Sequence, residues 1–150
     1  MLGYTYQDTI ILIGSKSGTT RTSVALTNAY QAEAAGKPTK SFRTGGLSKI
    51  NFGILYTTGT GETNNSIEVK IESSADGTNF YQIPNESVSG GTSTLTQREF
   101  TFVGASAATA YSLSLPIDVQ DEYIRISVKE SGVSSNAGTI FVEATLSGAK

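Results

Sequence analysis

The chain has 150 residues, of which 37% are hydrophobic and 16% charged, and its formal net charge is −2; this length suits one compact domain with its own core. The near-neutral charge argues against bulk nucleic-acid binding, because neutralising phosphates requires a basic excess. Histidine, cysteine and tryptophan are absent, which excludes His general bases, Cys nucleophiles, thiolate zinc sites, disulfides and the Ser-His-Asp triad. We therefore expect a protein that is not an enzyme and that uses no cofactor or metal ion.

Targeting signals are not evident in the sequence. There is no run of about 18 apolar residues that could cross a membrane. The start lacks a basic region, and the apolar stretch 9–14 is too short and too early for a secretory signal. We expect the chain to fold in the cytosol that makes it.

The N-terminal segment is basic and polar. Residues 1–61 carry a formal charge of +4 and the remaining residues −6. The Gly-, Ser- and Thr-rich stretch 14–21 is typical of an exposed arm that could lie on an acidic neighbouring surface, or of an ordinary solvated loop. We predict an N-terminal arm or loop over residues 1–21, and a single domain over 22–150. Apolar and aromatic side chains in the arm are candidates for docking against a partner, and the predicted contact residues are Leu2, Tyr4, Tyr6, Ile11 and Arg21.

The next segment is ambiguous. Residues 22–27 suit a strand, whereas 28–36 suit either a continued strand or a helix of about two turns that ends at Gly36 and Pro38. Phe42, followed by Gly45 and Gly46, indicates a short edge strand and a turn.

From Ser48 onward, apolar residues recur at every second position. This period of two is typical of strands with one face on a core and one in water. Gly-, Asn- and Ser-rich turns separate the strands, and an Asp-Gly hairpin over 73–81 joins two of them. We predict an all-β antiparallel β-sandwich or jelly roll. Its strands lie within 48–57, 67–72, 100–102, 111–117, 124–128 and 140–146.

Acidic residues offer two alternative sites. Asp76 could help to bind calcium, but only one carboxylate is local, so a structural turn is the preferred interpretation. Asp118, Asp121 and Glu122 could supply paired carboxylates for glycoside hydrolysis, but nothing in the sequence fixes their separation, and a solvated loop is preferred. The glycines around residue 60 are followed by Glu62 and match no phosphate-binding motif.

A stretch of the sequence resembles a known group of proteins. Residues 56–82, YTTGTGETNNSIEVKIESSADGTNFYQ, look like a turn, strand and hairpin found in small β-sandwich virion proteins of tailed bacteriophages. Residues 123–131 and 138–146 are similar to the closing strands of that group, so the resemblance covers about residues 48–147. The Asp-Gly hairpin also occurs in discoidin-like and carbohydrate-binding sandwiches, but Phe80 stands where those modules often have tryptophan.

The resemblance implies a structural role on a phage particle. The first expectation is a capsid decoration (cement) protein that binds the lattice of the major capsid protein, commonly as a homotrimer, at the capsid surface after synthesis in the host cytoplasm. A tail or fibre component is the next. From another class, the chain could be a glycan-binding module that holds a sugar with loop residues Asn79, Tyr81 and Asp121. An enzyme in which Asp118 and Asp121 converge is the last alternative.

Overall fold

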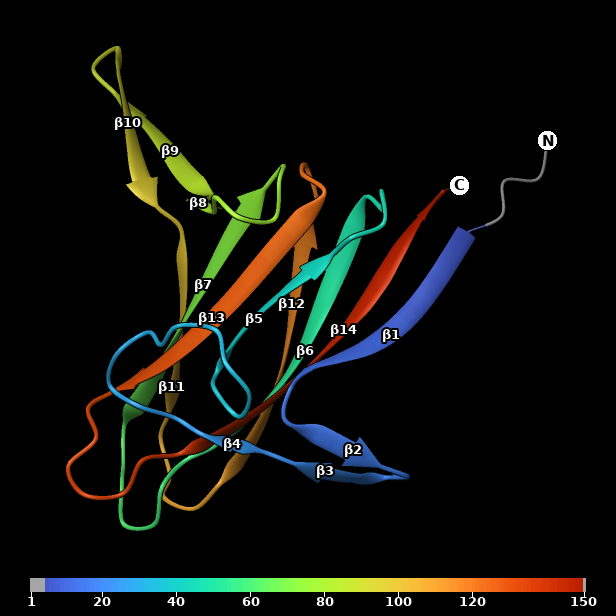
Figure 1. Ribbon diagram of the computed structural model, residues 1–150. Coiled ribbons are helices and arrows are strands. Elements are labelled where there is room, and N and C mark those ends of the chain that lie inside the picture. Colours follow the sequence, from blue (N-terminus) through green and yellow to red (C-terminus); the bar gives the residue numbers. More distant parts are fainter. Residues whose placement is uncertain (1–4, 150) are drawn as a thin grey trace.

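The computed structural model describes residues 5–149 and contains two antiparallel β-sheets packed face to face (Figure 1). The first sheet has the order β1 (Thr5–Ile13), β14 (Thr139–Ala149), β6 (Lys49–Thr57), β12 (Ala110–Asp118), and β4 (Val24–Ala25) also pairs with β14. The second has the order β11 (Glu99–Gly104), β7 (Asn65–Ser74), β13 (Tyr123–Ser131), β5 (Thr39–Arg43), and β8 (Tyr81–Gln82) also pairs with β7. The predicted antiparallel β-sandwich is confirmed. None of the described residues forms a helix that could cross a membrane.

Two further hairpins project from this sandwich. One consists of β2 (Ser15–Ser17) and β3 (Thr20–Thr22), and the other of β9 (Pro84–Ser89) and β10 (Thr92–Gln97). Figure 1 shows them at opposite corners of the molecule, with β9 and β10 at the upper left and β2 and β3 at the lower right. Each therefore presents its surface away from the core.

The six alternating segments form the strands that the sequence predicts. Their apolar faces meet between the sheets, because each strand places alternate side chains on one side. The predicted edge strand at Phe42 is β5, at the border of the second sheet. The predicted strand over 22–27 is divided: Thr22 ends β3, which pairs with β2, and β4 pairs with β14. Residues 28–36 form neither a helix nor a strand.

The N-terminal boundary of the sandwich differs from the expected one. Residues 5–13 do not form an arm: they pair with β14, from Thr5 opposite Ala149 to Ile13 opposite Val142. A β-bulge between Ile11 and Ile13 shifts the register. The bulge breaks the alternation of apolar and polar residues, so this strand carries a continuous apolar run and lacks the period of two that marks the others.

The core lies between the two inner faces. Large side chains of β6 from the first sheet meet branched side chains of β7 and β13 from the second. Each such side chain stabilises the fold by about 1.5–3 kcal/mol when fully buried. Fully buried side chains of this core include Phe52, Tyr56, Ile67, Ile71, Ile124, Ile126, Val128 and Ile140.

A buried hydrogen-bond network joins the two sheets at one end of this core. The Tyr56 hydroxyl on β6 donates to Glu130 Oε1 on β13 at 2.6 Å, and the Gly138 amide donates to Glu130 Oε2 at 2.6 Å. Glu130 and Tyr56 are both fully buried. The buried carboxyl group therefore has a donor from the facing sheet and another from the residue just before β14, which meets the requirement that buried polar groups be hydrogen-bonded.

A second buried carboxylate fixes the neighbouring loops. Glu62 accepts the backbone amides of Ser134, Ser135 and Asn136 at 3.0, 2.5 and 2.8 Å. These amide hydrogen bonds, led by that of Asn136, lower the pKa of Glu62 from 4.5 to about 2. The loop between β13 and β14 is thus tied to the turn between β6 and β7.

We predict that Glu62→Gln flattens the acid dependence of stability. Because the pKa of Glu62 is lowered on folding, its contribution is complete above pH 4.5 and is lost as the pH falls towards 2. Urea unfolding across this range measures the effect, and Glu86→Gln on the exposed β9 is the matched control. A variant with the same acid dependence as the unmodified protein contradicts the prediction.

We predict that Gly138→Ala destabilises the fold by about 2 kcal/mol or more through overpacking. A Cβ atom at this position would lie 2.5 Å from the Thr57 carbonyl oxygen and 2.8 Å from Glu130 Oε1. Gly36→Ala is the control, because it has a positive φ of 70° but open space around it and costs about 1 kcal/mol of backbone strain. Equal losses of the free energy of unfolding in the two variants would refute the steric argument.

Candidate functional site

The predicted contact residues differ in where they lie in the structure. Leu2 and Tyr4 lie outside the described residues. Tyr6 belongs to β1, where its backbone is opposite Gly148. Ile11 lies opposite Glu143 and is 37% exposed, although its strand is part of the sandwich. Of the described contact candidates outside the β2–β3 hairpin, Ile11 therefore offers an apolar side chain to a partner.

Arg21 makes its contacts within the chain. Its guanidinium donates to Glu143 Oε1 at 3.0 Å and lies 5.4 Å from the centre of the Phe141 ring. Lys16 Nζ, from the other strand of the same hairpin, is 3.8 Å from Glu143 Oε2. Arg21 thus fastens the β2–β3 hairpin to the outer face of the first sheet and shields Phe141, which is buried.

The acidic loop residues have separate structural partners. Asp121 accepts the Ser73 hydroxyl at 2.5 Å, and Glu122 accepts the guanidinium of Arg43. Within residues 5–149, no group of three acidic side chains converges as a metal site would require. The structure brings Asp121 and Glu122 into contacts that hold loops, and it places Asp118 at the end of β12 opposite Lys49.

Asp76 forms the structural turn that the sequence predicts. Its Oδ1 accepts the amides of Thr78 and Asn79, both at 2.8 Å, and its Oδ2 accepts the Asn79 side-chain amide at 2.8 Å. Gly77 has a positive φ of 73°, as the tight turn requires. Both oxygens of Asp76 are therefore engaged by the turn itself.

The residues considered for sugar binding lie near one another but differ in availability. Tyr81 is opposite Ser73 in the sheet, and Ser73 bonds to Asp121. The Asn79 side chain is held by Asp76. Tyr81, which is 71% exposed, is the available member of the set.

The outer face of the second sheet carries a ladder of paired charges that the sequence analysis did not identify. Lys129 lies 2.8 Å from Glu68, and Arg125 lies 2.7 Å from Glu72. The Tyr30 ring is covered by two ammonium groups, Lys70 at 4.7 Å and Lys129 at 4.8 Å. Burial, followed by nearby glutamates, raises the pKa of the Tyr30 hydroxyl. These opposite charges are paired with one another and make this face a polar surface.

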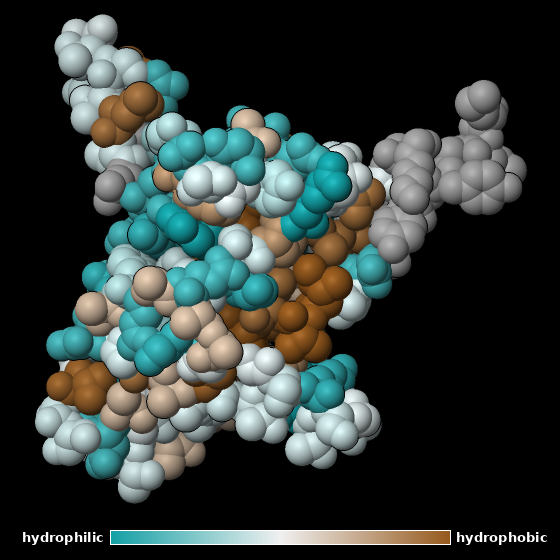
Figure 2. Space-filling model, in the orientation of Figure 1, coloured by the Kyte–Doolittle hydropathy of each residue, from teal (hydrophilic) through white to brown (hydrophobic). Residues whose placement is uncertain are grey.

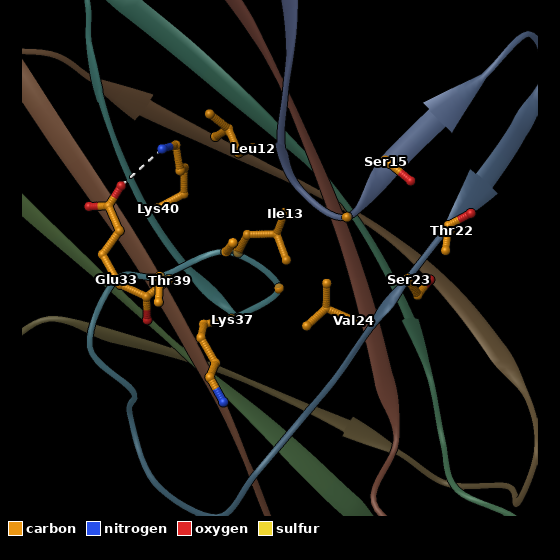
Figure 3. Close-up of a pocket in the computed structure, with 14 residues that line it drawn as sticks. Leu12, Ile13, Ser15, Thr22, Ser23, Val24, Glu33, Lys37, Thr39 and Lys40 are labelled. Atoms are coloured by element: carbon orange, nitrogen blue, oxygen red, sulfur yellow. Dashed lines mark hydrogen bonds and ion pairs between the residues drawn. The ribbon is translucent and has the colours of Figure 1, made fainter.

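One hollow of the molecule lies along the border between the sheets. It has a volume of about 640 Å³ and lies between the edge strand β1 and the segment that leads into the edge strand β5. Figure 3 shows the side chains of Ile13 and Val24 on one side and Lys37 on the other, with Lys40 bonded to Glu33. A second, separate hollow of about 300 Å³, lined by Ile10, Leu47 and Leu146 among others, lies beside the same two strands and shares no lining residue with the first. We call the two together the edge groove.

The apolar character of this groove is visible on the surface. Figure 2 shows an apolar area in the middle of the face that contains the groove, bordered by hydrophilic residues. The β9–β10 hairpin carries a second apolar feature: Val88 is 69% and Leu95 66% exposed. Surfaces of this kind are typical of protein-docking sites. The sequence contained a signal for the β9–β10 hairpin, namely the Gly90-Gly91 turn. It contained no comparable signal for the groove, because the groove is formed by segments that are distant along the chain.

We predict that Arg21→Gln increases amide hydrogen exchange over residues 15–22 while it lowers global stability by about 1 kcal/mol or less. The substitution removes an exposed ion pair and a cation–π contact, each of which contributes little to the whole fold, but these contacts fasten the hairpin. Lys16→Gln, which removes the longer 3.8 Å ion pair, is the control and has a smaller effect. Unchanged exchange in the Arg21 variant would show that the hairpin is held otherwise.

Comparison with known proteins supports the architecture. No family model matches the chain, and no curated protein matches it either. Among solved structures, it is similar to dimeric latent PorU from Porphyromonas gingivalis, with a TM-score of 0.50 and 10% identity over 99% of this chain and 13% of PorU. It also matches an exo-β-1,3-galactanase from Phanerochaete chrysosporium solved with galactose, with a TM-score of 0.37 and 15% identity over 96% of this chain and 27% of the enzyme. The chain thus spans less than a third of each of these proteins, and the likeness to PorU shows a shared fold.

Proposed function

We propose that the chain is a non-enzymatic structural protein of a bacteriophage virion, of the capsid-decoration type, that binds the assembled lattice of the major capsid protein as a homotrimer. The sequence resemblance over residues 48–147 supports this function. The observation that carries it is that large apolar side chains remain exposed on β1, on β8 and on the projecting β9–β10 hairpin: Ile11, Tyr81, Val88 and Leu95. This distribution suits docking against other proteins.

The proposed action is stabilisation by mass action. A protein that binds the assembled shell and not its free subunits shifts the equilibrium towards the shell by that difference in binding free energy. A trimer contacts several shell subunits at once, so modest contacts add through effective concentration. Asp76, Asp121, Glu122, Glu62 and Glu130 are each engaged in structural contacts, which fits a protein that works by binding.

The experiment measures co-sedimentation with shells assembled from the major capsid protein of the same genome. We expect saturable binding by the unmodified chain and at least a fivefold weaker affinity for Ile11→Gln, which removes an exposed apolar side chain from β1. Val103→Gln, the same type of change on the outer surface of β11, is the control and keeps its affinity. Deletion of residues 1–20 is unsuitable, because it would remove the edge strand β1 from the first sheet.

Three results would contradict the proposal in distinct ways. Failure of the folded, unmodified chain to sediment with shells excludes capsid decoration. Binding to purified tails instead assigns the chain to the tail or fibre. Equal losses in the Ile11 and Val103 variants show that β1 does not provide the contact surface.

A further inference from the structure

We infer that copies of this chain join head to tail: the β9–β10 hairpin of one copy adds to the free edge of β1 in the next copy and places Val88 and Leu95 in its edge groove. This inference concerns contacts between copies of the chain. It stands independently of any binding to a capsid.

The receiving side is an unpaired strand edge above an apolar groove. Among residues 5–149, β1 pairs with β14 on one side and hydrogen-bonds to no strand on the other, although β5 of the facing sheet lies close to part of it. It is nine residues long, and its sole charged residue is Asp8. Native edge strands are usually short, charged, bulged or covered, because a long apolar edge invites pairing with another strand. The bulge near Leu12 disturbs one end of β1 but leaves residues 5–11 in regular register.

The inserting side is a hairpin with a single apolar face. In its register, Ser93 lies opposite Val88 and Leu95 lies opposite Glu86. Directly opposed residues share a face, and so do residues two apart, so all four side chains lie on one face. An isolated two-stranded hairpin is marginally stable in water, and both large apolar side chains of this face are about two-thirds exposed. Contact with another chain would cover them.

The β9–β10 hairpin and the edge groove lie apart in one copy, so contact between them requires two copies. The hairpin projects at the upper left of Figure 1, whereas the groove lies between β5 and β1, towards the other side of the molecule. One chain therefore cannot fill its own groove without rebuilding the sheets. Two strands side by side span about 5 Å between axes, so β9 or β10 can pair with β1 while its neighbour covers the opening towards β5.

The charges of the two surfaces are complementary. Glu86 is the one charged residue of β9 and β10, and it lies on the apolar face of the hairpin. The rim of the groove carries Lys37, which is exposed, and Lys40, which is bonded to Glu33. In the joined copies we place Glu86 beside Lys37. An opposite-charge contact of this kind favours the correct register more than it adds affinity.

Head-to-tail contact is heterologous, because each copy uses one surface to give and a different one to receive. Such contacts close into a ring if the rotation between copies permits, and otherwise extend into a filament. Each copy within the assembly has both its groove and its hairpin covered.

The test measures mass in solution by analytical ultracentrifugation up to about 200 µM chain, a range that detects weak association. We expect the unmodified chain to self-associate. The double variant Val88→Ser with Leu95→Ser should weaken association at least tenfold, and Ala35→Arg, which places a large side chain in the groove, should do the same. Ser87→Ala with Thr94→Ala on the other face of the hairpin, and Ala29→Arg outside the groove lining, are the matched controls.

Mixing the two weakened variants distinguishes head-to-tail contact from a symmetric one. The hairpin variant keeps an intact groove and the groove variant keeps an intact hairpin, so their mixture should form a 1:1 complex that grows no further. A symmetric contact between two hairpins or between two β1 edges would yield no such complex and would overturn the inference. So would an unmodified chain that stays monomeric throughout the range, or a hairpin variant that associates normally.

A charge exchange tests the register with little risk to folding. Glu86→Lys and Lys37→Glu should each weaken association, and the chain with both substitutions should regain it. Thermal unfolding confirms that each variant is folded. If the doubly substituted chain is as weak as the more affected single variant, the pairing of Glu86 with Lys37 is wrong, and with it the register that we propose.

Discussion

The fold depends on a carboxylate that neither sheet could bury alone. Glu130 projects from β13 into the interface, where Tyr56 of the facing sheet and the Gly138 amide each donate to it. A buried carboxyl group without hydrogen-bond donors would cost about 1–3 kcal/mol, whereas one bonded from both sides fixes how the sheets meet. Space for this contact comes from glycines: a side chain at Gly104 or Gly138 would collide with Tyr56 or its neighbours. The sheets are therefore joined here by a buried hydrogen bond between facing strands.

The sequence predicts those strands that have one face on the core and the other face in water. The period of two over 48–57 or 124–128 reflects one face on the core and one in water, and both segments form strands. It also places Glu130 in line with Ile124, Ile126 and Val128, which was an available signal for an inward-facing acid. β1 was missed because a bulge removes its periodicity. β9 and β10 were missed because they pack against no core, so their Ser- and Thr-rich sequence has no burial pattern to reveal.

The candidate site was harder to predict from the sequence than the strands were. The edge groove combines residues of β1 with the segments 22–24 and 33–40, and residues 26–38, which lead from β4 to β5, form neither a helix nor a strand. Arg21 was expected to contact a partner because it lies in a basic, polar stretch. Its actual position follows from the β2–β3 hairpin, which returns it to Glu143 and Phe141, more than a hundred residues away in the sequence.

Polar and apolar side chains on the surface of this molecule differ in whether they have partners within the chain. The charges on the second sheet are paired, and the acids of the loops accept hydrogen bonds from nearby amides and hydroxyls. Apolar side chains, in contrast, remain exposed on the projecting hairpin, where Val88 and Leu95 face water. Covering apolar surface releases free energy roughly in proportion to its area, whereas charges that are already paired gain little from a new partner. Association of this chain should therefore be driven by its strand edges and its hairpin, with the paired charges determining which surfaces stay in water.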